Sequence, residues 1–248
     1  MLLHAADAVQ QGDRKILLRM VDTDVLVLAV AVFHHLSSMR PEEQLEVWVA
    51  FGTGINLRYI PAHSIACNLG PERSKALPAF HAFTGCDTVS CFAGWGKKTA
   101  MEAWKACPEV TSAFLSLSCP LAQITDRNME LLQRFVILMY DRTSNKTKVN
   151  HARKALFSKK GKSLDLIPPT LAALYEHMKR TALQAGHCWG QCLVVRPQLP
   201  SPEEWGWVLT AGSPSGQPFQ MSQSLVESLY DAGATKDVKE GVPVSRLT

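Results

Sequence analysis

Three aspartates stand where the folded chain could bring their carboxylates together. Asp22 and Asp24 lie between a short apolar run and a longer one that begins at Val25. Asp87 comes much later in the chain, shortly after Gly85. Carboxylates held close together repel one another unless a cation lies among them. Because oxygen ligands of this kind suit Mg²⁺ or Mn²⁺, the pattern predicts a metal site formed by Asp22, Asp24 and Asp87.

A cation in such a site would activate water for in-line attack on a phosphodiester. We therefore expect the three aspartates to be the catalytic residues as well as the metal ligands. The alternative is that Asp22 only caps a helix and Asp87 only closes a turn. His81 is interpreted as a satisfied core histidine, with a phosphate contact or a role as an acid as the alternative.

A glycine pair follows Asp87. Gly94-Trp95-Gly96 precedes Lys97 and Lys98 in the sequence. Glycines allow a backbone to approach phosphate closely, and the start of the next helix favours an anion. The lysines would add salt-dependent affinity without reading sequence. The pattern thus predicts a helix–hairpin–helix in which Gly94, Gly96, Lys97 and Lys98 contact DNA, or else an ordinary helical corner with exposed lysines.

A second basic segment, the basic stripe, spans residues 142–162. It contains no Asp or Glu, and its basic residues are Arg142, Lys146, Lys148, Arg153, Lys154, Lys159, Lys160 and Lys162. Such a run favours polyanions. We expect Lys146, Lys148, Arg153 and Lys154 to bind nucleic acid, with a merely solvated loop and helix face as the alternative.

Composition limits the class of protein. The chain has 248 residues, a hydrophobic fraction of 46%, a charged fraction of 19% and a net charge of +4, which suits one large globular domain or a domain with an appendage. Its seven cysteines are irregularly spaced and predict reduced thiols rather than a disulfide framework. The longest apolar run, residues 25–33, is too short to span a bilayer, and the N-terminus lacks a basic leader. We expect a nuclear or cytoplasmic protein with no membrane partner.

The order of elements predicts an α/β core followed by helices. A glycine at position 70 separates two helices, and Pro78 should kink the second. The expected strands are 16–21, 45–51 and 57–60, and the expected helices are 1–10, 23–37, 61–70, 71–83, 88–93, 97–106, 108–117, 125–140, 148–157 and 169–185. We divide the chain into a core at 1–107 that includes the helix–hairpin–helix, a helical extension at 108–196, and an extended arm with a disordered tail at 197–248.

These motifs resemble the PIN-like superfamily, in particular the flap endonuclease and XPG-type 5′ nucleases. More closely, the chain resembles a family of uncharacterised animal proteins, often multicopy, for which an origin in mobile elements is one interpretation. This closer resemblance spans about residues 1–207 and rests on the segments 22–26, 58–61, 81–87 and 96–100. It implies a PIN-like core with a parallel sheet and a Mg²⁺ or Mn²⁺ site at Asp22, Asp24 and Asp87, and it assigns Gly94, Gly96, Lys97 and Lys98 to the DNA backbone.

Two departures from the nuclease pattern keep the function open. Trp95 replaces the small or basic residue usual in the hairpin. The further acidic residues that such nucleases carry on the first strand and the helix after it are missing, as if Met1 entered that helix midway. Three functions therefore remain: a metal-dependent structure-specific nuclease acting on DNA, a catalytically inactive nucleic-acid-binding remnant of a mobile element, and a protein-interaction scaffold.

Overall fold

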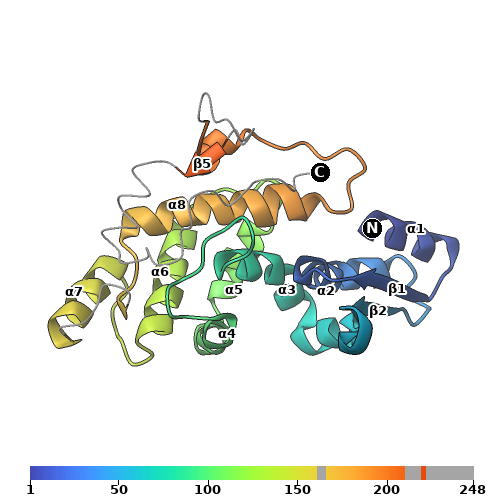
Figure 1. Ribbon diagram of the computed structural model, residues 1–248, viewed down its shortest axis with the longest axis horizontal. Coiled ribbons are helices and arrows are strands. Elements are labelled where there is room, and N and C mark those ends of the chain that lie inside the picture. Colours follow the sequence, from blue (N-terminus) through green and yellow to red (C-terminus); the bar gives the residue numbers. More distant parts are fainter. Residues whose placement is uncertain (161–165, 210–218, 222–248) are drawn as a thin grey trace.

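The computed structural model describes residues 1–160, 166–209 and 219–221. Most of the tail expected after residue 197 lies outside the described residues, as does Lys162 of the basic stripe. Figure 1 shows the α/β elements at one end of the molecule and the later helices at the other, with α3 between them.

The first part of the chain is an α/β unit built on a small sheet. Its elements are α1 (Leu2–Gln11), β1 (Lys15–Met20), α2 (Thr23–Ser38), β2 (Glu46–Phe51) and β3 (Arg58–Pro61). The strand order is β1-β2-β3, with β1 parallel to β2 and β2 antiparallel to β3. The expected parallel sheet is therefore correct only for β1 and β2. The sheet is mixed because the short connection after β2 turns the chain straight back, whereas a parallel partner needs a longer crossover.

Alternating burial explains why β1 is a strand. Ile16, Leu18 and Met20 are buried, and the residues between them are exposed, so one face of the strand carries the core. This period of two is the signature of a half-buried strand. The chain then enters α2, where the side chain of Asp22 accepts a hydrogen bond from the backbone N–H of Asp24 (2.9 Å). Asp22 is thus the N-cap that the sequence indicated.

The long helix α3 (Ala62–Phe83) is interrupted once. Gly70 has φ 78° and ψ 166°, outside the helical region, so the two helices expected on either side of it are confirmed. The kink expected at Pro78 is wrong, because α3 leaves helical geometry only at Gly70. The backbone N–H of Ala79 next to that proline donates to Ser118 Oγ (3.2 Å). A side chain from a neighbouring helix thus joins the hydrogen bonding where the proline cannot donate.

The second part of the chain is helical. Its elements are α4 (Lys97–Ala106), α5 (Val110–Leu117), α6 (Asp126–Tyr140), α7 (Val149–Lys160), α8 (Leu171–Thr181) and a π-helix (Ala182–Cys188) that continues α8. A short 3₁₀ helix (Pro202–Trp205) leads into β4 (Trp207–Leu209), which pairs antiparallel with β5 (Phe219–Met221).

The helix expected at 88–93 is wrong. Residues 84–96 form a loop between α3 and α4. Within it, Cys86 and Val89 exchange backbone hydrogen bonds (3.0 and 3.3 Å) and close a tight turn that contains Asp87. Gly85 enters this turn with φ 106°, a value that favours glycine. The turn uses backbone groups that a helix would have needed, and no helix precedes the Gly94–Gly96 segment within the loop.

Two hydrophobic cores divide the molecule near Gly70. The first joins α1, α2, the sheet and the start of α3, and its members run from Leu2 to Ala66. The second joins the end of α3 to the later helices and includes Trp104 of α4. Helix α4 packs with the helical part, although the sequence-based division at 107 placed it in the first domain. Fully buried Phe83, Phe114 and Phe135 meet edge-on or tilted in the second core, and each contributes about 1.5–3 kcal/mol by burial.

Candidate functional site

A hydrogen bond joins Asp24 to His81. His81 Nε2 donates to Asp24 Oδ1 at 2.8 Å, and both side chains are largely covered, with 23% of the Asp24 side chain and 8% of the His81 side chain exposed. Asp24 stands in the first turn of α2, directly after the carboxyl end of β1, while His81 stands in the last turn of α3. In open α/β sheets, ligands gather at the carboxyl ends of strands. The pair therefore lies at the edge of the sheet where a site is expected.

The Trp189 indole contacts the His81 side of this pair. Its ring centroid lies 5.9 Å from that of the His81 imidazole. Trp189 packs against both hydrophobic cores, so it contacts His81 where the two parts of the molecule meet. Sequence reasoning missed both the Asp24–His81 hydrogen bond and this tryptophan, since nothing in their local patterns indicates the contact.

The ammonium group of Lys97 is directed toward the end of α3, although the residue as a whole is exposed. Its Nζ donates to the carbonyl oxygens of His81 (2.8 Å) and Gly85 (2.6 Å) and to Thr84 Oγ1 (3.1 Å). All three ammonium protons therefore have protein acceptors at the C-terminus of α3, where the helix dipole favours a cation. Lys97 thus links the start of α4 to the end of α3. Its phosphate contact stays a prediction.

The charge of Asp24 acts on Cys86 in the loop 84–96 and on Lys97 directly after it. Burial lowers the pKa of Lys97, and the nearby Cys86 and Asp24 act in the opposite direction. Burial also raises the pKa of the Cys86 thiol, to which the Asp24 charge contributes. Cys86 Sγ contacts Thr88 Oγ1 at 3.5 Å, and its raised pKa makes it a poor nucleophile. Cys86 directly precedes Asp87, so the Asp87 turn belongs to the surroundings of Asp24.

The three predicted metal ligands are not gathered into one cluster. Asp22 is exposed and caps α2, Asp24 faces His81, and Asp87 is exposed on its turn. In the part of the chain that the structure describes, no group of three or more His, Cys, Asp or Glu side chains could hold a metal ion. The structure brings Asp22 and Asp24 to one helix start and places the Asp87 turn in their neighbourhood.

The glycine segment leaves one lysine directed outward. Gly94 has φ 75°, and an added Cβ at Gly94 or Gly96 would meet nothing within 4 Å, so the backbone here is open to a ligand. Lys98 is exposed in the first turn of α4. The side chain of Trp95 turns inward instead and packs edge-on against Tyr140 at 5.3 Å between ring centroids. Gly94, Gly96 and Lys98 therefore remain candidates for a phosphate contact, which stays a prediction.

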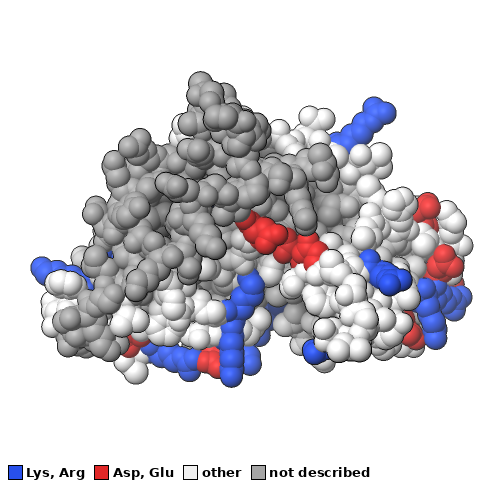
Figure 2. All heavy atoms as spheres, viewed as in Figure 1, with Lys and Arg blue, Asp and Glu red and all other residues white. Residues whose placement is uncertain are grey.

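The basic stripe is partly neutralised. Arg142 pairs with Glu102, Lys148 Nζ lies 3.3 Å from Glu130 Oε1, and Arg153 donates to a backbone carbonyl. Lys146 and Lys154 are exposed and make no ion pair with any described acidic residue. Figure 2 shows basic and acidic side chains side by side along one edge of the molecule. Of the four predicted stripe contacts, Lys146 and Lys154 have the charge most available to a polyanion.

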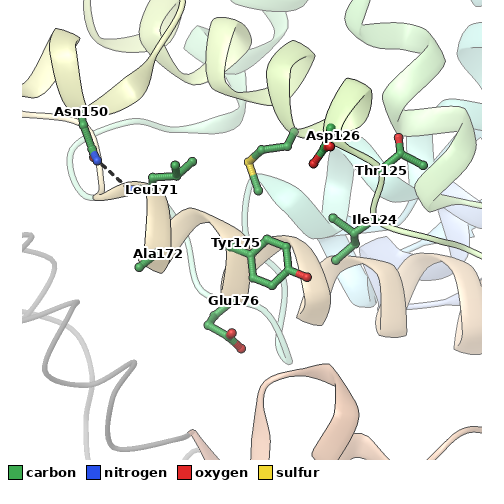
Figure 3. A pocket seen from close by; sticks show the side chains of 9 residues that line it. Ile124, Thr125, Asp126, Asn150, Leu171, Ala172, Tyr175 and Glu176 are labelled. Atoms are coloured by element: carbon green, nitrogen blue, oxygen red, sulfur yellow. Dashed lines mark hydrogen bonds between the residues drawn. The ribbon is translucent and has the colours of Figure 1, made fainter.

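A groove of about 720 Å³ lies away from Asp24, between the start of α6 and α8. In Figure 3 the Tyr175 ring points toward Ile124, and the Asp126 and Glu176 carboxylates lie on opposite sides of it. Its polar groups do not converge on one point. The groove therefore supplies no alternative catalytic centre.

Comparisons with known proteins assign the chain to no family. No protein-family model, no curated protein and no solved structure matches this chain. None of the helices in the described segments is long and apolar enough to cross a membrane. The fold is thus α/β with a small mixed sheet and a mostly helical remainder.

Proposed function

We propose that this chain is a nuclease-like protein of the PIN type that acts on nucleic-acid phosphodiesters with Mg²⁺ or Mn²⁺. The observation that carries the proposal is the position of Asp24, at the carboxyl end of β1 and hydrogen-bonded to the helix that leads into the Asp87 turn. Asp22 at the same helix start adds a second carboxylate. These residues supply the hard oxygen ligands that Mg²⁺ prefers.

The residues fit a divalent cation only in part. Asp22 and Asp24 share one helix start, whereas Asp87 is a third ligand only if its turn shifts toward them. A bound Mg²⁺ would supply activated water and charge neutralisation at the phosphate. In this proposal His81 orients the Asp24 carboxylate, Lys97 holds the end of α3 and the beginning of the loop, and Lys98 and the open glycine backbone contact the nucleic-acid strand.

Cleavage of a branched DNA tests the proposal. We expect Mg²⁺-dependent cutting that EDTA stops and that Asp87→Asn or Asp24→Asn abolishes. Asp13→Asn is the matched control, since Asp13 is an exposed aspartate on the turn before β1. Undiminished cutting by Asp87→Asn would assign the activity to something other than this site.

Binding without cleavage is the second candidate. It is favoured by Lys146 and Lys154, which are exposed and make no ion pair with any described acidic residue. In that case, DNA affinity should fall steeply with salt while no product forms. The salt slope is the slope of the logarithm of the binding constant against the logarithm of the salt concentration. Replacing Lys146 and Lys154 with Gln should reduce its size by about 1 for each of the two lysines that contacts a phosphate. As the control, Lys75→Gln on α3 should leave the slope unchanged. No binding at low salt would favour the scaffold.

A further inference from the structure

Arg180 is a buried cation that no described residue neutralises at hydrogen-bonding distance. The side chain lies in the last turn of α8, and the residue is 1% exposed. Its Nε, Nη1 and Nη2 atoms are buried, and none of them has a hydrogen-bond partner among the described residues. Burial lowers the pKa of Arg180 to about 10, still well above neutrality, so the guanidinium is charged. A buried guanidinium is stable only when an acceptor meets its donors.

The two polar neighbours of Arg180 on α8, His177 and Glu176, make no hydrogen bond to it. His177 Nε2 donates to the Phe83 carbonyl (2.7 Å), and its Nδ1 lies 3.2 Å from Ser90 Oγ, so the imidazole has no atom left for Arg180. Glu176 is near enough to raise the pKa of Arg180, yet its Oε1 accepts from Lys179 Nζ at 3.0 Å. The other carboxylate oxygen, Oε2, makes no hydrogen bond to the guanidinium, since none of the three guanidinium nitrogens has a partner among the described residues.

Gly206 lies close to the guanidinium. After the π-helix the chain turns back along α8 (Figure 1). Gly206, which follows the 3₁₀ helix, lies next to Glu176 and Arg180 of α8. A Cβ added at Gly206 would lie 2.9 Å from Glu176 Oε2 and 3.4 Å from Arg180 Nη1, and the φ of Gly206 is 84°. The preceding residue, Trp205, also has a buried indole Nε1 without a hydrogen-bond partner among the described residues. The Trp205 ring packs against the His187 ring, with 4.4 Å between their centroids.

We propose that Arg180 is the receptor of a small oxyanion, a phosphate or a carboxylate, held between α8 and the segment 202–206. The planar guanidinium offers two parallel N–H groups, which match a carboxylate or a phosphate in a bidentate pair. The depth of the group selects a compact anion, since a nucleic-acid strand cannot reach a 1% exposed side chain. Glu176 opposes the anion by its charge, which favours a singly charged ligand. The site is independent of the proposed nuclease function.

Thermal unfolding in phosphate and in acetate, each against chloride at equal ionic strength, tests the site. An anion that binds only the folded chain raises Tm as its concentration increases. We expect this rise with phosphate, acetate or both, and its loss in Arg180→Met. The exposed Arg127→Met is the matched control, because it removes one positive charge at the surface. A rise with phosphate alone identifies the phosphate class, and a rise with acetate alone identifies a carboxylate. An equal rise in wild type and Arg180→Met overturns the proposal.

The variant Glu176→Gln tests whether the partner of Arg180 is a bound oxyanion or Glu176, its nearest carboxylate. This test does not depend on whether Arg180→Met folds. If an oxyanion is the partner of Arg180, removing the opposing carboxylate should tighten anion binding several-fold, measured by equilibrium dialysis with labelled phosphate or acetate. If Glu176 is itself the partner, Glu176→Gln should lower Tm markedly in chloride and leave the anion response flat. That second result would overturn the proposal, as would a wild-type protein that binds neither anion.

Discussion

His81 Nε2 lies 2.8 Å from Asp24 Oδ1, although the two residues are 57 positions apart in the sequence. This hydrogen bond joins the end of α3 to the start of α2. The contact crosses from the α/β part to the helical part, because His81 belongs to the second half of α3. It also brings the end of α3, from which the chain continues to the Asp87 turn, next to the start of α2. The relation between these two side chains organises the candidate site.

The hydrogen bond between Asp24 and His81 should be measurable as a coupling energy. We expect Asp24→Ala and His81→Ala each to lower the free energy of unfolding, and the double variant to lose about 1–2 kcal/mol less than the sum, because the second change removes a bond that the first has already broken. Urea denaturation of the four proteins gives the value. Strictly additive losses would show that the hydrogen bond contributes nothing.

Lys97 and Lys98 should differ in stability although they are neighbours of the same type. Lys97→Met leaves the carbonyls of His81 and Gly85 without their donor, and we expect a loss of about 1–2 kcal/mol in the free energy of unfolding. Lys98→Met should change it by less than about 0.5 kcal/mol, since the exposed Lys98 side chain makes no hydrogen bond or ion pair among the described residues, whereas Lys97 makes three hydrogen bonds. Chemical denaturation compares the two. Equal losses would mean that the three hydrogen bonds of Lys97 are not stabilising.

Gly186 should tolerate no side chain. A Cβ at this position of the π-helix would lie 2.4 Å from the Cys119 carbonyl oxygen and 2.7 Å from that of Leu117. We expect Gly186→Ser to destabilise the fold by about 1–3 kcal/mol through overpacking, seen as a lower Tm. Gly96→Ser is the control, because an added Cβ there meets nothing within 4 Å and serine is a good N-cap. The prediction fails if both variants melt together.

The buried imidazole of His177 should make stability depend on pH. Burial, with a contribution from the Arg180 charge, lowers the pKa of His177 from 6.5 to about 3, while its hydrogen bond to the Phe83 carbonyl acts in the opposite direction. Between these values the unfolded chain binds a proton that the folded chain does not. Stability should therefore be full above about pH 6.5 and fall as the pH drops toward 3, by about 2 kcal/mol at pH 5.

Comparison of variants isolates the contribution of His177. His177→Gln should be less stable at pH 7, yet it should lose less stability than the wild type between pH 7 and pH 5. His35→Gln, at an exposed position of α2, should keep the wild-type slope. Urea denaturation at the two pH values provides the measurement. A slope unchanged in His177→Gln would show that another group titrates.

Elements with a local cause could be predicted from the sequence. Helix α4 spans the residues expected for it, 97–106, and α2 begins at its predicted cap, because caps and apolar periods act within one or two turns. The break at Gly70 follows from the glycine–proline pair. The antiparallel edge strand and the 84–96 loop could not be predicted in this way, since both depend on which segment returns to which.

The candidate site shows the same division. That Asp22 caps a helix and that Asp24 follows a core strand was determined by the sequence alone, because each depends only on neighbours along the chain. Only the tertiary structure decided that Asp24 meets His81 and that the Lys97 ammonium donates to acceptors at the end of α3. It also decided that the Arg180 guanidinium is buried without a hydrogen-bonding acceptor among the described residues. Long side chains take their partners from whatever the packing brings within reach, and the packing of α3 and α8 joins residues that local patterns do not connect.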